Sequence, residues 1–269
     1  MNRFLQTFAS QRAIDVTAFI GQWPTRLQSS ASAKDLSAMA DRYQLEGLCV
    51  SHIASIFGFD TRSGNEALFA DTSGDKRLWP FPILNPSEPG WEWELEWAAK
   101  AGARGIRLVP GYQRYSLLSP EVQQLAKAAA EIKLPLHVCA RLEDERLQHP
   151  LFQAKTVPFH ELAELIRMCE GSPLIISGLR AGEHGYVKEL LNDGFNADNV
   201  LFDLWFANGP LAAISVLCKS GASRHAAYGS CTPIQVMEAT AFQLGSADIS
   251  ETERAGLCRN NALRLLASR

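Results

Sequence analysis

Short apolar runs recur along the chain at nearly regular intervals, and this feature limits the possible folds most strongly. Eight runs that suit buried β-strands begin near Ala13, Gly47, Trp79, Gly105, Pro135, Pro173, Asn199 and His225. The intervals between successive starts are 34, 32, 26, 30, 38, 26 and 26 residues. Each interval is long enough for a strand, a crossover helix and two loops. The pattern therefore predicts parallel strands that are connected by helices.

Helix signals lie between these runs, where such a fold needs them. Residues 32–35 (SAKD) and 250–253 (SETE) have the spacing of a capping box. Ser119 is followed by Pro120, a cap with proline at the first helical position. Gly194 is expected to end the helix that contains VKELLND. Strand and helix signals thus alternate along the chain.

Eight strand–helix units in 269 residues predict an α/β fold of one domain, a single (β/α)8 TIM barrel over residues 1–269. The alternative is a doubly wound open sheet, which usually has fewer strands. No GxGxxG follows the first strand, so the main sign of a dinucleotide-binding sheet is missing. No linker, charge block or low-complexity tract divides the chain.

Composition excludes several classes of partner. The chain has 26 basic and 29 acidic residues and a net charge of −3, so we expect no nucleic-acid partner and no membrane partner. No apolar run reaches about 18 residues, and the N-terminus lacks the apolar segment of a secretory signal. Six scattered cysteines without a CxxC pair predict reduced core thiols and a cytoplasmic location.

Several segments, taken in order, resemble the amidohydrolase-related TIM-barrel family, which includes metal-dependent hydrolases and decarboxylases. They are IDVTAFIG, RLWPFPILNP, GARGIRLVPGY, LPLHVCAR, NVLFDLW, YGSCTP and LCRNNALRLL. The resemblance covers nearly the whole chain. YGSCTP with the NNALRLL ending, and GIRLVP, are its most specific pieces.

The metal ligands of that family have no counterparts here. The family places a His-x-His at the first strand, a histidine at the ends of the fifth and sixth strands, and an aspartate at the eighth. These positions fall on Thr17, Phe19, Cys139, Gly178 and Cys231. The resemblance therefore implies a barrel without the usual metal site, and we expect no metal or other cofactor. A rebuilt site of His137, Cys139 and Cys231 remains open, because thiolate and imidazole suit zinc.

Arginines fall at the predicted C-terminal ends of the strands, where barrel enzymes place their chemistry. They are Arg107, Arg141 and Arg180. Guanidinium forks suit carboxylate or phosphate, so the sequence suggests a site for a small anionic ligand. The alternative is that these arginines pair structurally with Asp203, Glu143 or Asp144.

Two residues are candidates for acid–base catalysis. Asp203 lies in the apolar run LFDLW, where a carboxylate is costly to bury unless it is paired. It is either a general base or, as we favour, one half of an ion pair with an arginine across the barrel. His52 follows the second strand and is either an acid–base group or a loop histidine bonded to backbone.

Further residues are expected to line a ligand pocket at the same end of the barrel. They are Thr17, Cys139, Cys231, Tyr112 and Trp205. The segment GYQRYS after the fourth strand brings Tyr112, Arg114 and Tyr115 to the lip of that pocket.

Three functions are compatible with these residues. The first is a metal-independent hydrolase or lyase for a small carboxylated substrate, with Asp203 and His52 as acid–base groups. The second is a catalytically inactive barrel that binds a small anionic metabolite or a partner protein. The third is a metal hydrolase with a rebuilt Cys/His site. No GxSxG, P-loop or HExxH supports other hydrolase or nucleotide chemistry, and a homodimer is a family-level expectation.

Overall fold

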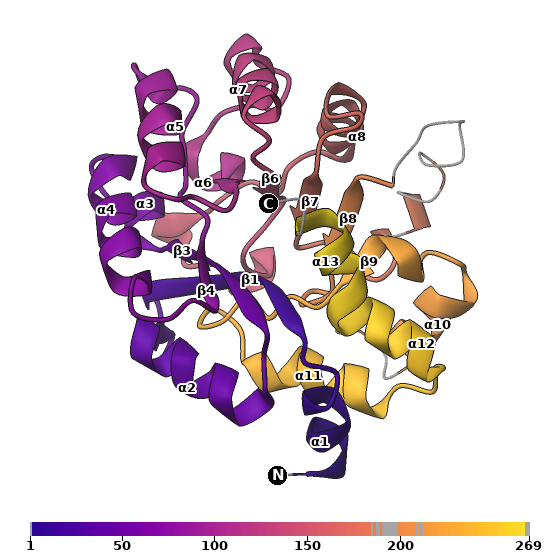
Figure 1. Ribbon diagram of the computed structural model, residues 1–269. Coiled ribbons are helices and arrows are strands. Elements are labelled where there is room, and N and C mark those ends of the chain that lie inside the picture. The colour runs from indigo at the N-terminus through magenta and orange to yellow at the C-terminus, as the bar shows by residue number, and fades with distance from the viewer. Residues whose placement is uncertain are drawn as a thin grey trace.

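The computed structural model describes residues 2–183, 185–186, 189, 198–207, 209 and 212–266. All eight predicted strand segments form parallel strands (Figure 1). They are β1 (Ile14–Gln22), β3 (Gly47–His52), β4 (Leu78–Pro80), β5 (Ile106–Leu108), β6 (Leu136–Cys139), β7 (Leu174–Ser177), β8 (Val200–Asp203) and β9 (Ala226–Ala227). The short strand β2 (Ser30–Ala31) pairs antiparallel with the end of β1.

The strands follow one another round the barrel in chain order. Hydrogen bonds connect β2-β1-β3-β4 in one sheet and β5-β6-β7-β8-β9 in another. Parallel bridges join the two sheets at both edges, between Ala18 and Thr232 and between Ile83 and Arg107. The Phe19 N–H also donates to the Thr232 carbonyl at 2.8 Å. These contacts complete the ring of the predicted TIM barrel.

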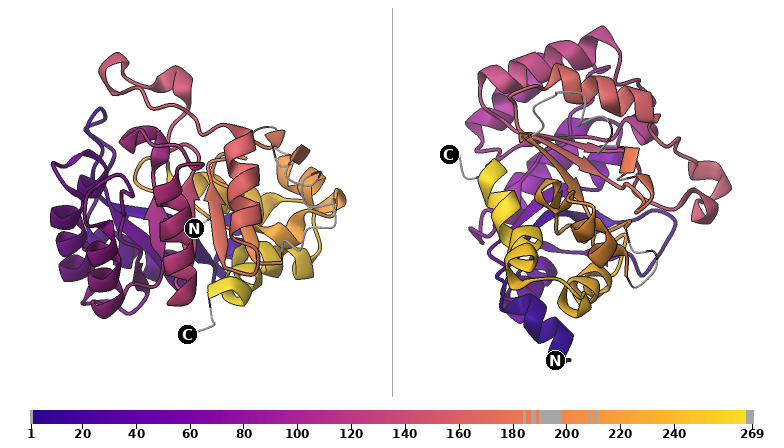
Figure 2. Two further views of the ribbon diagram at one scale, coloured as in Figure 1. Left: turned by 90° about the horizontal axis from the view of Figure 1, so that it is seen from above. Right: turned by 90° about the vertical axis from the view of Figure 1, so that its right-hand side faces the viewer.

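Helices surround the ring of strands, as Figures 1 and 2 show. They include α2 (Ala33–Tyr43), α4 (Thr61–Thr72), α5 (Trp91–Lys100), α7 (Pro120–Glu131), α8 (Phe159–Met168), α10 (Ala213–Lys219), α11 (Met237–Ser246) and α13 (Asn261–Leu266). Short ones are α1 (Arg3–Ala9), α3 (Ala54–Phe57), α6 (Pro110–Gln113), α12 (Glu251–Ala255), η1 (Glu145–Leu147), η2 (Pro150–Phe152), η3 (Ser223–His225) and the π-turn η4 (Gly256–Asn260).

The helix caps predicted from the sequence are confirmed where the structure describes them. Complete capping boxes begin α2 at Ser32 and α12 at Ser250. The Ser119 hydroxyl caps α7, whose first residue is Pro120. The expected helix end at Gly194 lies outside the described residues.

The barrel interior is a packed core at its N-terminal end. Alternate strand residues such as Val16, Ile175 and Leu201 point inward and meet Leu265 of α13, which covers that end. The other strand residues pack outward against the helices. Polar side chains that could act on a ligand are therefore restricted to the C-terminal end. All six cysteines are buried and free. None of the described helices combines the length and apolar character needed to cross a membrane.

Candidate functional site at the centre and rim of the barrel

Asp203 lies fully buried at the end of β8 and is surrounded by hydrogen-bond donors. Its Oδ2 accepts from the Thr17 hydroxyl at 2.5 Å and from the Ser177 hydroxyl. Its Oδ1 accepts from the Gly178 N–H at 3.0 Å. Burial raises the pKa of Asp203 to about 6, although these hydrogen bonds lower it. The ion pair that we favoured from the sequence is not formed with any described arginine, because hydroxyls from β1 and β7 stabilise the carboxyl instead.

His137 on β6 connects this carboxyl group to Arg107. Its Nε2 lies 3.5 Å from the Thr17 hydroxyl oxygen, and Arg107 Nη2 lies 3.1 Å from its Nδ1. A guanidinium only donates, so Nδ1 accepts and the ring proton is on Nε2, facing Thr17. Burial and the charge of Arg107 hold the pKa of His137 well below its usual range. We call Arg107, His137, Thr17 and Asp203 the central network.

Arg107 points into the barrel, as the strand parity predicts, and is fully buried. Its guanidinium donates to the carbonyls of Ala18 at 2.9 Å and Cys49 at 3.0 Å. Its Cζ lies 4.6 Å from the centroid of the Phe19 ring, a cation–π contact. Burial lowers the pKa of Arg107. The side chain hence joins β1 to β3 inside the barrel and is not presented at an open mouth.

The positions that correspond to metal ligands do not fit a metal ion. The Phe19 ring is fully buried against Arg107, and the Cys139 side chain is buried in an apolar cluster. Gly178 has a φ of +86°, and a Cβ there would lie 2.4 Å from the Arg141 carbonyl oxygen. A side-chain ligand at position 178 therefore requires the backbone to move. The described residues contain no group of three or more His, Cys, Asp or Glu side chains placed to hold a metal.

The rebuilt site of His137, Cys139 and Cys231 is not formed either. Both ring nitrogens of His137 belong to the central network. The two cysteines pack among apolar side chains, in the same cluster as Phe19 and Trp205. They act as small apolar fillers.

A second buried carboxyl, Asp15 on β1, is a residue that the sequence analysis missed. Its Oδ1 accepts from the N–H groups of Thr17 at 3.0 Å and Ser230 at 2.9 Å, and its Oδ2 accepts from the Ser230 hydroxyl at 2.6 Å. Burial raises the pKa of Asp15 to about 7. The sequence could have indicated it, because Asp15 is the one charged residue in the apolar segment AIDVTAF. These bonds fasten β1 to the segment after β9.

An apolar cluster fills the C-terminal mouth above the central network. Its buried members are Phe19, Trp23, Ile53, Ile56, Ile83, Val109, Cys139, Leu142, Trp205, Cys231 and Ile234. Trp23, Phe57 and Tyr112 form an aromatic roof with ring centroids 5.1–5.6 Å apart. The Trp205 indole N–H donates to the Ser177 hydroxyl at 3.0 Å. The structure thus brings Cys139, Cys231, Tyr112 and Trp205 together, but in a packed cluster.

Glu143 lies beneath this roof, after β6, and its side chain is only 2% exposed. Arg26 Nη2 lies 2.9 Å from its Oε1, and the Tyr112 hydroxyl lies 3.4 Å from its Oε2. Burial raises the pKa of Glu143, and the charge of Arg26 opposes this shift. From its sequence position, Glu143 was expected to pair with an arginine near a strand end, whereas its partner Arg26 comes from the β1–β2 loop.

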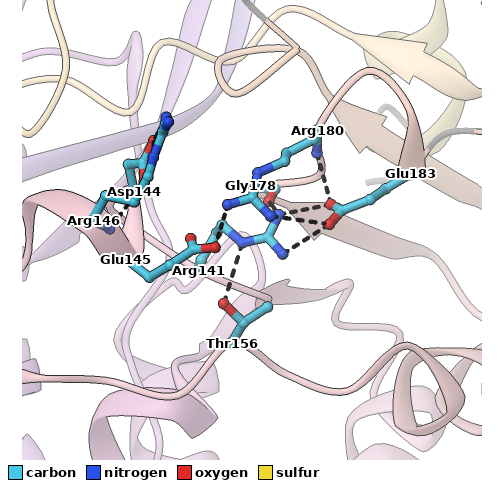
Figure 3. A network of polar contacts seen from close by, with 8 residues as sticks. All are labelled: Arg141, Asp144, Glu145, Arg146, Thr156, Gly178, Arg180 and Glu183. Carbon is cyan, nitrogen blue, oxygen red and sulfur yellow. Dashed lines mark hydrogen bonds and ion pairs between the residues drawn. The ribbon is translucent and has the colours of Figure 1, made fainter.

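Arg141 and Arg180 pair with acidic side chains that differ from the expected ones (Figure 3). The Arg141 guanidinium donates to both Glu183 oxygens, at 2.6 and 3.0 Å, and to the Gly178 carbonyl at 2.7 Å. Arg180 donates to Glu145. Arg141 and Arg180 therefore form ion pairs with Glu183 and Glu145, and the expected pairs with Asp203, Glu143 or Asp144 are not formed.

His52, at the end of β3, is partly buried. Its Nδ1 accepts from the Ala54 N–H at 3.1 Å, and burial lowers its pKa. This is the backbone-bonded loop histidine of the alternative interpretation. The structure gives no contact between His52 and Asp203, both of which it describes, so the expected acid–base pair is not assembled.

A cavity of about 560 Å³ lies between the α6 region and the segment before α8, and no residue of the central network lines it. We call it the rim pocket; it is lined by Pro110, Gly111, Arg114, Tyr115, Ser116, Gln153, Lys155, Thr156, Val157, Pro158 and Glu161. The GYQRYS segment contributes Arg114 and Tyr115, whereas Tyr112 turns into the aromatic roof. Part of the segment forms the helix α6 instead of a loop.

Comparisons with known proteins agree with this architecture. Residues 27–267 match the model of the family described as amidohydrolase. No curated protein matches the chain.

Several solved structures share the fold. A dihydroxybenzoic acid decarboxylase from Polaromonas sp. JS666, with bound manganese, has a TM-score of 0.71 and 14% identity, covering 95% of this chain and 96% of that chain. A 5-carboxyvanillate decarboxylase from Novosphingobium aromaticivorans, also with manganese, has a TM-score of 0.70 and 14% identity, covering 99% of both chains. A probable 2-pyrone-4,6-dicarboxylic acid hydrolase from Acinetobacter baumannii, with citric acid bound, has a TM-score of 0.66 and 13% identity, covering 95% and 99%.

Proposed function

Since the chain belongs to the amidohydrolase family, we propose that it is a catalytically inactive member which binds a small carboxylate-bearing molecule. One observation carries the proposal. Every polar side chain of the central network is fully buried and hydrogen-bonded to another protein group. A catalytic acid or base must reach the reacting atoms of a substrate. No member of this network reaches a ligand without a rearrangement of the packed mouth.

The ligand class is supported by the similar structures and by the charge of the rim. Two of those structures are decarboxylases of carboxylated aromatic compounds, and a third binds citric acid. A barrel that keeps a carboxylate-binding role needs exposed cations, and the rim pocket supplies Arg114 and Lys155.

The test is ligand stabilisation measured together with turnover. The protein is heated with increasing 2,6-dihydroxybenzoate or citrate, and release of CO2 from 2,6-dihydroxybenzoate is followed separately. A ligand at about 100 times its Kd adds about 2.7 kcal/mol to the free energy of unfolding, so Tm should rise with concentration. We expect a rise in Tm for at least one of the two and no CO2. Release of CO2 at a rate proportional to protein, or a constant Tm with both, contradicts the proposal.

A second candidate function, a metal-independent hydrolase or lyase, is favoured by Glu143 alone. This carboxyl lies at the end of the barrel where the family's chemistry occurs, and burial raises its pKa toward the range of a general acid. It requires the aromatic roof to open. Any turnover that is found should then disappear in Glu143→Gln, and its rate should fall as pH rises through the pKa of Glu143, because a general acid must be protonated. Turnover that persists in this variant excludes Glu143 as the acid–base group.

We also infer a cytoplasmic protein that acts without nucleic acid or membrane, in which homodimers form through outer helices. The six free buried thiols and the net charge of −3 support the first part. Size-exclusion chromatography with light scattering tests the homodimer, and a monomeric mass contradicts it.

A further inference from the structure

We propose that the rim pocket is the ligand site of this protein and takes a small organic oxyanion through Arg114 and Lys155. The inference rests on the proposed function and adds the place and the binding groups. The pocket lies between α6 with the residues that follow it and the 153–158 segment that leads into α8. Its volume of about 560 Å³ is within the range of about 300–1,000 Å³ that small-molecule sites have.

The charge of the pocket favours an anion. Neither Arg114 nor Lys155 has an ion-pair or hydrogen-bond partner for its side chain in the part of the chain that the structure describes. By contrast, the lone acid of the pocket, Glu161, already accepts from the Ser116 hydroxyl at 2.8 Å and the Leu117 N–H at 2.7 Å through Oε2. Two cations without partners therefore face one acid that is already hydrogen-bonded.

Neutral groups of the pocket complete a site for an organic anion. The Tyr115 hydroxyl is buried, and it forms no well-aligned hydrogen bond with any described residue, although the Val109 backbone is near. Thr156 is oriented by Arg141, whose Nε lies 3.4 Å from its hydroxyl oxygen. Pro158, on the same wall, provides apolar surface for the body of the ligand.

The backbone holds the two cationic walls in place. Arg114 is the left-handed C-cap of α6, with a φ of 61°, and its N–H donates to the Pro110 carbonyl at 2.7 Å. A Cβ on Gly111 would lie 2.2 Å from the Lys155 carbonyl oxygen, so the walls are in contact at this glycine. Fixed walls reduce the ordering that a ligand must impose, and this favours binding.

The experiment measures binding of three probes by isothermal titration calorimetry: citrate, 2,6-dihydroxybenzoate and inorganic phosphate. It uses the full chain, the double variant Arg114→Gln/Lys155→Gln and the matched control Lys127→Gln/Lys219→Gln. The control removes the same charge from exposed positions on α7 and α10. Binding of citrate or 2,6-dihydroxybenzoate supports an organic carboxylate ligand, whereas binding of phosphate alone contradicts both the organic ligand and the proposed carboxylate-binding function.

We expect at least one probe to bind the unmodified chain and the control with equal Kd, and at least tenfold more weakly to the Arg114/Lys155 variant. Equal Kd in all three proteins overturns the rim site and leaves anion binding intact. Absence of binding to the unmodified chain overturns both the rim site and the proposed function. As a fold control, the melting curve of the Arg114/Lys155 variant should match that of the unmodified chain.

Discussion

The centre and the rim of this barrel use the same residue types in opposite ways. At the centre, Arg107 is fully buried and donates to the carbonyls of β1 and β3, and Asp203 is surrounded by hydroxyls. At the rim, Arg114 and Lys155 are exposed and have no partner among the described residues. A charged residue therefore has donors available for a ligand only where the fold leaves them without protein partners, as at Arg114 and Lys155.

In this barrel, positions that correspond to metal ligands of the family are occupied by a packed and hydrogen-bonded centre. In the centre, a guanidinium provides positive charge beside Phe19, which fills volume in the position of a ligand. His137 and Thr17 then connect that charge to Asp203. A buried polar network stabilises a fold only when its members are hydrogen-bonded. Each side chain of the central network has at least one such partner.

The largest expected effect is that of removing the central guanidinium. Arg107→Met should lower the free energy of unfolding by about 3–5 kcal/mol, because it leaves buried carbonyls and His137 without their donor. Urea denaturation measures this. The control Arg167→Met removes an exposed guanidinium of α8 that pairs with Glu164. It should change the free energy of unfolding by less than about 1 kcal/mol, because exposed ion pairs contribute little. Equal losses in the two variants would mean that the central network is not a stabilising unit.

Restoring a histidine at the sixth-strand position should fail for a structural reason. Gly178→His places a Cβ 2.4 Å from the Arg141 carbonyl oxygen at a φ of +86°. We expect a loss of about 2–4 kcal/mol from strain and overpacking, with no gain in bound zinc or manganese. Calorimetric melting and metal analysis check both parts. A stable variant that binds metal would show that the centre is not closed to a metal ion.

The pH dependence of stability should carry the signature of Asp203. Its pKa is raised to about 6 in the folded state, from 3.8 when unperturbed. Between about pH 4 and pH 6, the folded protein keeps the proton on Asp203 and the unfolded chain releases it. The free energy of unfolding therefore falls as pH rises through this window. Relative to the unmodified protein, Asp203→Asn should gain about 3 kcal/mol across that window. A constant difference between the two unfolding free energies would contradict a buried, protonatable Asp203.

The smallest effect on stability is expected at the rim. Arg114→Gln/Lys155→Gln should change the free energy of unfolding by less than about 0.5 kcal/mol, because neither side chain makes a described contact that is lost. A loss comparable with that of Arg107→Met would remove the distinction between the two regions. Equilibrium denaturation of this variant beside Arg107→Met provides the measurement.

Local patterns predict the fold well because strands, crossover helices and caps are encoded within short segments. The eight apolar runs and the capping boxes at Ser32 and Ser250 are all found as expected. The inward parity of Arg107 follows from the alternation of β5.

Side-chain partners were harder to predict, because the barrel brings together residues that are distant in the sequence. Asp203 meets Thr17 of β1, and Arg141 meets Glu183 rather than a nearby acid. Glu143 pairs with Arg26, which lies in the loop between β1 and β2. Residue type alone does not predict which acid each arginine pairs with, because every acidic side chain can accept from a guanidinium. The rim pocket depends likewise on how α6 and the segment before α8 come together.

The most direct test of the central claim is the metal content of protein purified without chelator and then incubated with manganese or zinc, measured by elemental mass spectrometry. We predict far less than one metal ion per chain, unchanged in Cys139→Ser and Cys231→Ser, because the ligand positions hold a phenylalanine, a glycine and buried thiols. About one tightly bound ion per chain, lost in either cysteine variant, would show that a rebuilt metal centre exists.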